Sequence, residues 1–403
     1  MCQYLIWGTN LRFSTVFQIY TMFALDYMSN GRTVGITDGL QAAQSSNTKP
    51  VTRTRSNSMT SSVSDGARLR PPHTEGHIKW LTTVDCGAEV MCTKFSSDGS
   101  LFAVGLSTGN IKIFQADGTL VYSLHDSDVL KMRLPCTSIQ FVPHRAVDSE
   151  DKSNILVATY ASGFIKFWHY PSGQCLNTII ESKQSSRQCL CSSLTLTGER
   201  MAIGGADPAI NVYDTVTKKK VVTLEPSDSR DVMNGHRLRV FAVQYHPNDT
   251  HMLISGGWDD TIQFWDDRTP HAVRRIYGPH ICGDALDIDG VHNHVITGSW
   301  RKNNVLQIWD IASGSKIKDV PQDALHKCML YCCQWLGKDY IICGGNEQNM
   351  ARIIDRGTLN TVAQVVDLEQ GVYSIDNDRQ GGLPKLVIGA AHNVYLMKQE
   401  KRV

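Results

Sequence analysis

The chain has 403 residues, of which 41% are hydrophobic and 20% charged, a composition typical of a globular protein. Its 40 basic and 39 acidic residues leave a formal net charge of +1, so total charge provides no long-range attraction to nucleic acid or to an anionic membrane. We therefore expect no direct nucleic-acid partner.

The first 28 residues are rich in apolar and aromatic side chains, but their pattern does not predict a membrane-spanning helix. Their longest uncharged run, Phe13 to Leu25, is too short to cross a bilayer as a helix. A basic start and a clear small-residue cleavage site are both missing, which argues against a signal peptide. We interpret this segment as an interfacial or packing helix and expect no membrane span.

Residues 29–76 change in character and are rich in Ser, Thr, Asn and Arg. A segment with so few large apolar residues cannot bury enough surface to offset its ordering entropy. We therefore predict an N-terminal extension over residues 1–76 that ends in a disordered linker. Within it, "RTRSNS" places arginines before Ser56 and Ser58, which are candidate phosphorylation sites for a basophilic kinase; the alternative is a solvated linker.

From residue 77 onward the chain repeats itself. Each unit contains several short runs with strand-like alternation, and its third run ends in a large apolar residue. These markers recur roughly every 45 residues, a period typical of four-stranded propeller blades. The seven markers are Phe114, Trp168, Tyr213, Trp265, Trp309, Ile354 and Leu396.

A run of small residues and a tight turn precede each third strand, as in "SGGWDD" and "CGGNEQN". Small residues let the inner strands approach the ring axis closely, and Gly, Asn or Asp suits the backbone angles of the turn. Seven third strands predict an all-β, seven-bladed propeller of four-stranded antiparallel blades over residues 77–403. The last unit lacks a fourth strand, so we expect residues 77–86 to pair near Asn393 to Met397 and close the ring.

These motifs resemble the WD-repeat family over roughly residues 77–399. The fourth unit matches best, with "GHRLRVFAVQYHP" and the pair Trp265-Asp266. The resemblance implies a structural hydrogen-bond network of His236, Ser255, Asp259 and Trp265. It also implies a scaffold for protein interactions.

Sequence signatures of catalysis are missing: there is no Gly-x-Ser-x-Gly, His-Glu-x-x-His, P-loop or dinucleotide fingerprint. His292 and His294 lack a third ligand, so we read them as a turn or surface pair. The twelve cysteines contain no CxxC pair and several lie in apolar runs, as expected for buried thiols. We expect a non-enzymatic protein without metal or cofactor, located inside the cell in the cytoplasm or nucleus; a propeller enzyme is the less favoured alternative.

The narrow end of the ring should collect two kinds of residue from every blade. One lies early on the first strand (Met91, Thr137, Ser192, Phe241, Asp284, Tyr331 and Tyr373). The other lies beside the turn between the second and third strands (Trp258, Trp300, Arg301, Asn346 and Glu347). Aromatic rings flanked by carboxylates suit a peptide that carries Arg or Lys. We therefore predict a partner-binding rim of Phe241, Trp258, Asp284, Trp300, Arg301, Tyr331, Glu347 and Tyr373.

The stretch Leu253 to Arg268 supports an alternative function. It resembles the longer box of WD-repeat substrate receptors in cullin-RING ubiquitin ligases, which ends in Trp265-Asp266-Asp267-Arg268 here. That resemblance implies docking to the ligase adaptor, with Asp266 and Arg268 as contacts. The scaffold and the ligase receptor both remain open on the sequence alone.

Overall fold

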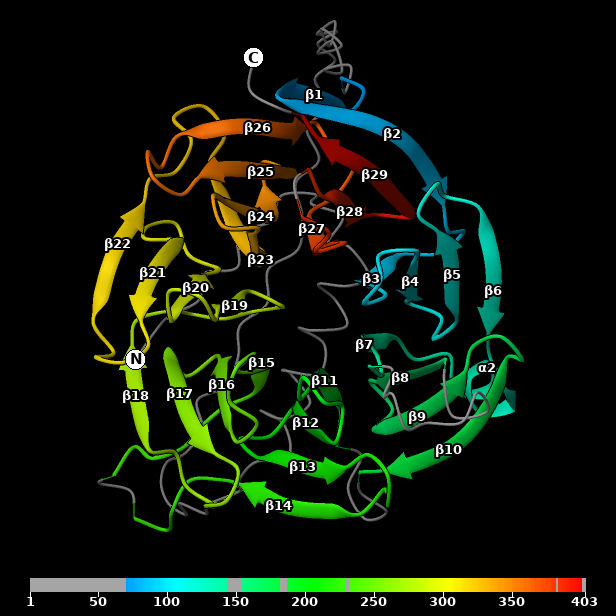
Figure 1. The fold of residues 1–403 in the computed structure, drawn as a ribbon, viewed down its shortest axis with the longest axis vertical. Helices are drawn as coiled ribbons and strands as arrows, with labels where there is room; N and C mark the ends of the chain where they lie inside the picture. Colours follow the sequence, from blue (N-terminus) through cyan, green and yellow to red (C-terminus); the bar gives the residue numbers. More distant parts are fainter. Residues whose placement is uncertain (1–69, 144–153, 182–186, 230–231, 382, 401–403) are drawn as a thin grey trace, which may run out of the picture. The chain divides into compact units, whose positions relative to one another are not determined.

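The computed structural model describes residues 70–143, 154–181, 187–229, 232–381 and 383–400. The candidate sites Ser56 and Ser58 and the apolar first 28 residues lie outside these ranges. The described chain is almost entirely β-structure, and one short helix, α2 (Ser127–Met132), connects two sheets. Seven antiparallel sheets form the blades of a ring (Figure 1).

Blades 1 to 4 each use four consecutive strands. They are β3 (Val90–Phe95), β4 (Leu101–Leu106), β5 (Ile111–Gln115) and β6 (Leu120–Leu124); β7 (Cys136–Phe141), β8 (Ile155–Tyr160), β9 (Phe164–His169) and β10 (Gln174–Ile180); β11 (Cys189–Leu194), β12 (Arg200–Gly205), β13 (Ile210–Asp214) and β14 (Lys220–Leu224); and β15 (Val240–Tyr245), β16 (Met252–Gly257), β17 (Thr261–Asp266) and β18 (Arg274–Tyr277).

Blades 5 to 7 complete the ring, and the last two borrow strands from the start of the described chain. Their strands are β19 (Leu286–Asp289), β20 (His294–Gly298), β21 (Leu306–Asp310) and β22 (Lys316–Val320); β23 (Cys328–Leu336), β24 (Tyr340–Glu347), β25 (Met350–Asp355) and β26 (Thr361–Val366) with β1 (His73–Gly76); and β27 (Val372–Asn377), β28 (Lys385–Ala390) and β29 (Asn393–Gln399) with β2 (Ile78–Asp85).

Strand β2 closes the ring as the sequence predicts. It pairs antiparallel with β29, from Ile78 opposite Gln399 to Asp85 opposite Asn393. Trp80 packs edge-on against Tyr395, with 5.2 Å between the ring centroids. Strand β2 and the last described strand thus share blade 7, and the outer edge of β29 is paired.

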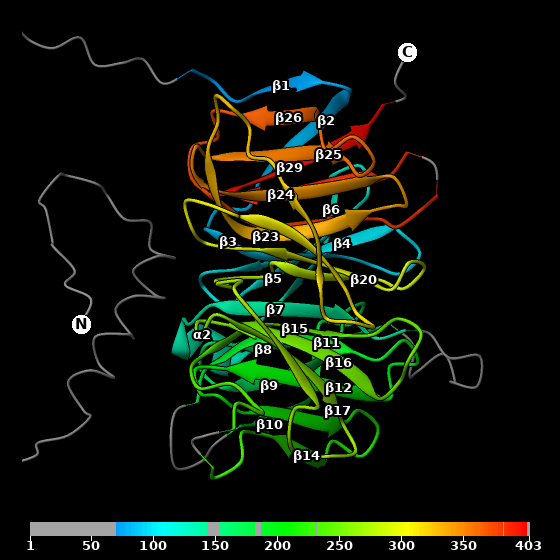
Figure 2. The ribbon, with the colours of Figure 1, turned by 90° about the vertical axis from the view of Figure 1, so that its left-hand side faces the viewer.

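Strand β1 is an addition that the sequence does not predict. It pairs with β26 and makes blade 6 five-stranded, as Figure 2 shows where β1 lies along β26. The chain therefore joins the propeller at His73, inside the segment assigned to the linker. Gly76 bends the chain from blade 6 to blade 7 with a positive φ of 77°, and a Cβ there would lie 2.2 Å from the Val362 carbonyl oxygen, so the turn requires glycine.

The first strand of each blade lies nearest the axis of the ring (Figure 1), and a layer of polar side chains links neighbouring first strands. The Asp376 carboxylate of blade 7 accepts a 2.6 Å hydrogen bond from the Phe95 N–H of blade 1. Ser193 accepts a bond from the Tyr245 N–H in the same way. These acceptors satisfy N–H groups on the inner edges of the first strands of blades 1 and 4, which would otherwise lack a partner in the ladder.

Candidate functional site

The four residues predicted as a structural network in blade 4 form one chain of hydrogen bonds. Trp265 Nε1 donates to the Ser255 hydroxyl at 2.7 Å, and that oxygen lies 2.7 Å from His236 Nε2. His236 Nδ1 lies 3.0 Å from Asp259 Oδ2. Ser255 has one proton to give, so a consistent assignment has Ser255 donating to Nε2 and Nδ1–H donating to the carboxylate.

Burial of Asp259 would raise its pKa, but hydrogen bonds from His236, the Arg237 N–H and Thr261 outweigh it and place the pKa below the usual value. Other blades use different partners for the same tryptophan position. Trp168 Nε1 donates to the Tyr160 hydroxyl at 3.2 Å, and Trp309 Nε1 donates to Thr297 at 3.0 Å. The network residues are therefore structural.

The predicted rim residues gather at the end of the ring where the second strand of each blade turns into the third; we call it the rim end. On the first strand, Phe241 lies at a β-bulge between Val240 and Ala242, next to the Gly257 end of β16. Tyr331 and Tyr373 occupy equivalent bulges in blades 6 and 7. A bulge turns the extra side chain out of the regular alternation, so these side chains meet the turn residues.

Ser192 is misaligned in the predicted set. The bulge of blade 3 lies between Cys189 and Cys191, so Leu190 holds the position equivalent to Phe241. Ser192 pairs regularly with Ile203, two residues further along the strand.

The marker residue of the last blade is also one position off. In blade 4, Trp265 lies opposite Leu253. In blade 7 the equivalent pair is Met397 opposite Leu386, so the marker is Met397 rather than Leu396.

One aromatic stack joins blades 4 and 5 at the rim end. The Trp258 ring stacks on Phe241 at 5.3 Å and on His280 at 6.4 Å, and the Arg239 guanidinium lies 5.5 Å from its centroid. Trp258 Nε1 donates to the Cys282 thiol at 2.9 Å. Trp258 is thus half-buried and fixed on several sides.

A second stack joins blades 5, 6 and 7. Trp300 stacks on Tyr331 at 6.2 Å, and Tyr331 contacts Tyr373 at 4.9 Å. Trp300 Nε1 donates to Asn346 Oδ1 at 3.2 Å. Phe241 and Tyr331 are only 3% and 5% exposed, so these two predicted rim residues support the stacks from below while Trp258, Trp300 and Tyr373 remain partly exposed.

The charged rim residues differ in their surroundings. Arg301 forms a 2.6 Å ion pair with Asp260, whose other partner is His280 at 2.7 Å. Glu347 is exposed at the end of β24 and has a positive φ of 76°. Neither Asp260 nor His280 was predicted, because both lie outside the two positions that recur in every blade.

Asp284 precedes β19 in blade 5, at the position equivalent to Phe241 in blade 4, and it is the one charged residue among the seven equivalent positions. Its side chain reaches water, but many protein atoms surround it. The resulting desolvation, together with the negative charge of Asp376, raises the pKa of Asp284, while the positive charges of Lys94 and Arg379 oppose that shift. No residue that the structure describes donates a hydrogen bond to this carboxylate. Its neighbours around the ring are Phe241 in blade 4 and Tyr331 in blade 6.

The proposed ligase contacts lie at the other end of blade 4. Strand β17 runs from Thr261 beside the rim turn to Asp266, so Arg268 follows on the opposite side of the ring. Arg268 is 64% exposed, and its Nε donates to Asp266 at 2.8 Å. The hydrogen bond from Arg268 lowers the pKa of Asp266 to about 2, so the carboxylate is charged at neutral pH.

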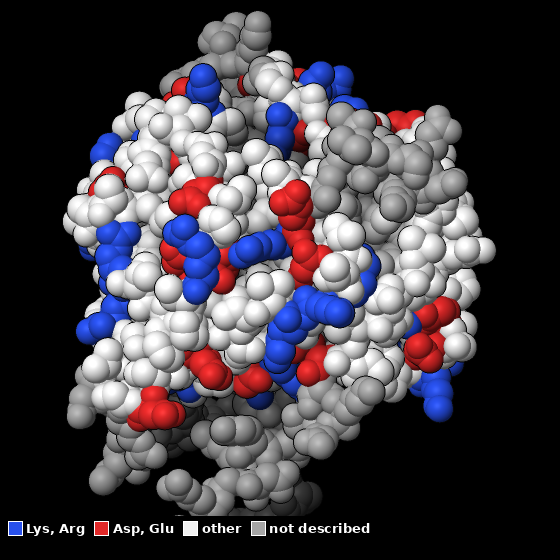
Figure 3. Space-filling view, turned by 60° about the horizontal axis from the view of Figure 1, so that its bottom comes forward, with Lys and Arg blue, Asp and Glu red and all other residues white. Residues whose placement is uncertain are grey.

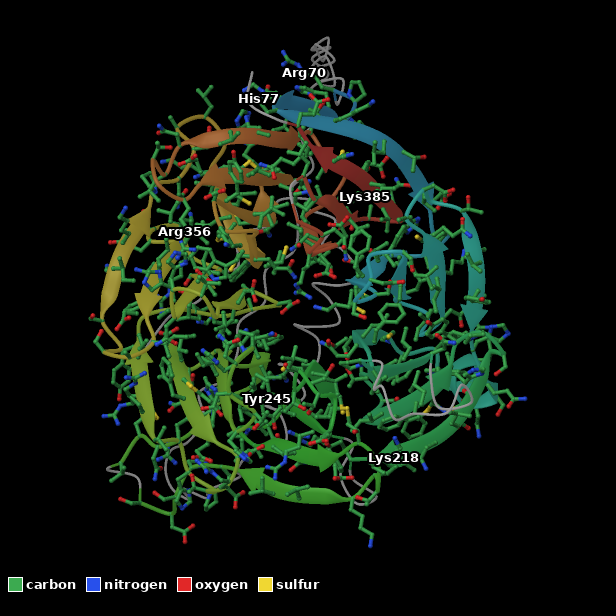
Figure 4. All side chains as sticks on the ribbon, viewed as in Figure 1. Arg70, His77, Lys218, Tyr245, Arg356 and Lys385 are labelled. Atoms are coloured by element: carbon green, nitrogen blue, oxygen red, sulfur yellow. The ribbon has the colours of Figure 1, made fainter. Side chains whose placement is uncertain are left out.

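The His292 and His294 rings stack at 5.9 Å, but each binds a different neighbour. His292 Nδ1 lies 2.7 Å from Asp289, and His294 Nδ1 accepts from Arg356, which is labelled in Figure 4. Within the described ranges, no group of three or more His, Cys, Asp or Glu side chains is placed to hold a metal ion. Nor does that part of the chain contain a helix long and apolar enough to cross a membrane.

Comparison with known proteins agrees with the fold. The family model of the WD domain, G-beta repeat, matches residues 73–115 and 227–266. The chain is 23% identical over 261 residues to apoptotic protease-activating factor 1 of Danio rerio, covering 61% of this chain and 16% of that protein. It is 29% identical over 143 residues to WD repeat-containing protein 25 of Mus musculus, covering 35% and 23% of the two chains.

A third relative is the guanine nucleotide-binding protein subunit beta-like protein of Encephalitozoon cuniculi, 26% identical over 136 residues that cover 34% of this chain and 38% of that protein. The chain therefore spans well under half the length of these relatives. Two matched repeats, relatives named for WD repeats and a closed ring of seven four-stranded blades agree with one another. The chain therefore carries WD repeats at residues 73–115 and 227–266, within a seven-bladed β-propeller.

Proposed function

We propose that the protein is a non-enzymatic scaffold that joins other proteins into a complex. Its binding surface for one partner is the aromatic half of the rim end, formed by blades 4 to 7. A scaffold of this kind needs a rigid ring and an accessible surface with few strong anchors. The two aromatic stacks supply the anchors, and the blades hold them in place.

The observation that carries this proposal is the Asp284 carboxylate between the two stacks. It is exposed to water, and no described residue donates a hydrogen bond to it. A carboxylate beside aromatic faces attracts a cation by charge and by cation–π contact. The partner segment is therefore expected to carry an Arg or Lys side chain, which Asp284 receives while Trp258 and Trp300 flank it.

Affinity purification from native cells, followed by mass spectrometry, tests this function. Partners recovered with the wild-type protein should be lost with Trp258→Ala or Trp300→Ala, at a cost of about 2 kcal/mol or more in binding. Tyr277→Ala is the matched control, because Tyr277 is 56% exposed on the outer strand β18. Unchanged recovery with both rim variants would exclude the aromatic half as the binding surface.

We place this scaffold inside the cell, in the cytoplasm or nucleus. Support comes from the cysteines, of which eleven are free thiols in the described chain and most are buried in the blades. Burial raises the pKa of thiols such as Cys86 and Cys282 to about 12, so these groups stay protonated and unreactive.

A second candidate function is that of a substrate receptor for a cullin-RING ubiquitin ligase. The favouring observation is the exposed turn after β17, where Asp266 holds the Arg268 guanidinium in a fixed orientation. A prearranged arginine loses little entropy on contact with a partner. The surface is remote from the rim end, so an adaptor there would leave the aromatic half free for substrate.

A further inference from the structure

Lys218 occupies a fixed position where blades 2 and 3 meet (Figure 4). It lies in the turn from β13 to β14, and its backbone N–H donates a 2.9 Å hydrogen bond to the Asp214 carbonyl. Its φ of 61° is in the left-handed region that glycine adopts most easily. The same turn position is Gly314 in blade 5 and Leu359 in blade 6. The turn therefore fixes the direction in which the lysine side chain leaves the backbone.

The amine of Lys218 lies on an apolar surface instead of in open water. Its Nζ is 3.4 Å from the centre of the Phe167 ring, which belongs to blade 2 and is only 2% exposed. Nζ also donates a hydrogen bond to the Thr215 carbonyl in its own turn. A charged amine loses hydration at such a site, and contact with a ring face restores only part of it. The position therefore favours the neutral amine more than an ordinary surface position does.

No carboxylate of the described chain forms an ion pair that would offset this loss of hydration. Asp214 is the one acid whose charge acts on Lys218. Its Oδ1 already accepts hydrogen bonds from the Val216 N–H and from the N–H and hydroxyl of Thr217. Burial outweighs the charge of Asp214 and lowers the pKa of Lys218 from 10.5 to about 8.

Lys166 shows how acidic partners reverse this effect. Its side chain is only 1% exposed, but Nζ lies 2.6 Å from Asp126 and 3.0 Å from Asp128. Burial acts to lower the pKa of Lys166, but hydrogen bonds to these two carboxylates outweigh it and raise the pKa, so the amine stays charged. Figure 3 shows Lys and Arg interspersed with Asp and Glu on the face that it presents, without a large patch of either sign. The state of a lysine in this protein thus depends on its immediate neighbours.

We propose that Lys218 is a site of acylation by acyl thioesters. The nucleophile in this reaction is a neutral amine, and a desolvated lysine supplies it. The nitrogen lone pair attacks the thioester carbonyl carbon, the C–S bond breaks, and the amine proton passes to the departing thiolate. Lys218 is only half-buried, so a small acyl donor reaches it from solvent.

The surroundings of Lys218 also suit the product of this reaction. An amide has no charge to hydrate, and its N–H can still donate to the Thr215 carbonyl. The acyl group adds apolar surface beside the Phe167 ring. No ion pair is lost when the charge disappears. Acylation at this position is therefore compatible with the folded blades, and it does not depend on the rim end.

Incubation of the full-length protein with acetyl coenzyme A at pH 7.4, followed by peptide mass spectrometry, tests the proposal. The exposed neighbours Lys219 and Lys220 are internal controls. A pKa near 8 gives roughly 200-fold more neutral amine at this pH than an ordinary lysine with a pKa of about 10.4. Lower nucleophilicity offsets part of that gain, so Lys218 should react about tenfold faster than either control. Its rate should level off above about pH 8, whereas an ordinary lysine continues to gain rate through pH 9.

Two further measurements show whether the fold causes the difference. In concentrated urea the three lysines should react at similar rates, because the contact with Phe167 is lost. Lys218→Gln, which is uncharged like the acylated side chain, should keep the melting temperature of the wild type. The proposal is overturned when Lys218 reacts no faster than its two neighbours in the folded protein, or when its advantage persists in urea. A fall of more than about 5 °C in Lys218→Gln would also overturn it, because the charged amine would then be structural.

Discussion

The Trp265 indole N–H donates a 2.7 Å hydrogen bond to the Ser255 hydroxyl, and both side chains are buried. Trp265→Ala should lower the free energy of unfolding by about 3–5 kcal/mol, because it removes a large buried ring and leaves part of the network unsatisfied. Trp265→Phe retains most of the ring and should cost less. Urea denaturation measures both.

Trp300→Ala is the matched control for this network, because Trp300 is a tryptophan of the adjacent blade that is only partly buried. It should cost clearly less than Trp265→Ala. Equal losses in the two variants would contradict the greater contribution to stability that burial assigns to Trp265.

The repeat, the number of blades and the closing strand could all be predicted from the sequence, because a fixed period of strands leaves few arrangements that bury every blade face. The register of a first strand could not be predicted where several of its residues fit the same repeating position. In "CLCSSL" several small residues fit the same position, and Ser192 was placed two residues beyond the bulge at Leu190. Strand β1, with the sequence His-Thr-Glu-Gly, carries no alternation and becomes a strand only because β26 offers an edge.

The candidate site could be predicted only in part. Trp258 and Trp300 were found because equivalent positions repeat in adjacent blades. The burial of Phe241 was missed, because the direction of a bulged side chain depends on the turn above it. His280 and Cys282 were missed because they come from a connection between blades that has no repeating pattern.

The pKa of Asp287 predicts a pH dependence of stability. Burial raises this pKa from 3.8 to about 6, although Arg379 and the Trp335 N–H oppose the shift. The folded state thus keeps the proton to higher pH than the unfolded chain does. Stability should therefore fall as pH rises from about 4 to about 6, by up to about 2–3 kcal/mol from this group.

Asp287→Asn should remove this part of the pH dependence. The variant should match the wild type near pH 4 and exceed it in free energy of unfolding at pH 7, since an amide still accepts the Trp335 N–H. Chemical denaturation at several pH values measures the difference. An unchanged slope in the variant would show that Asp287 does not titrate in this window.

Truncation tests how the two N-terminal strands contribute. Removing residues 1–69 should leave the melting temperature unchanged, because the described propeller stays intact. Removing residues 1–76 also deletes β1 and should lower it slightly, whereas removing residues 1–85 deletes β2 as well and should lower it by about 10 °C or more. Equal melting temperatures for the last two variants would contradict closure by β2.

Arg268→Ala tests the ligase candidate. The side chain is 64% exposed and contacts Asp266 in the same turn, so the melting temperature should not change. Co-purification of a cullin adaptor should be abolished if this turn is the docking site. Failure of the wild-type protein to recover any adaptor would exclude the ligase function.

Asp284→Asn should change stability and partner binding in opposite directions. Burial and the Asp376 charge raise the pKa of Asp284, so its ionised form is destabilising near neutral pH, and the amide should raise the free energy of unfolding there. The same change removes the charge expected to receive an Arg or Lys side chain, and should weaken partner binding about tenfold or more.

Asp287→Asn is the control for this prediction. It also removes an acidic side chain, but Asp287 lines a cavity at the other end of the ring, so rim-end binding should be unchanged. Denaturation at pH 7 and quantitative pull-downs measure the pair. An Asp284→Asn protein that is stabilised yet binds its partner normally would show that the carboxylate is not used in recognition. One that is destabilised would show that Asp284 has a structural role.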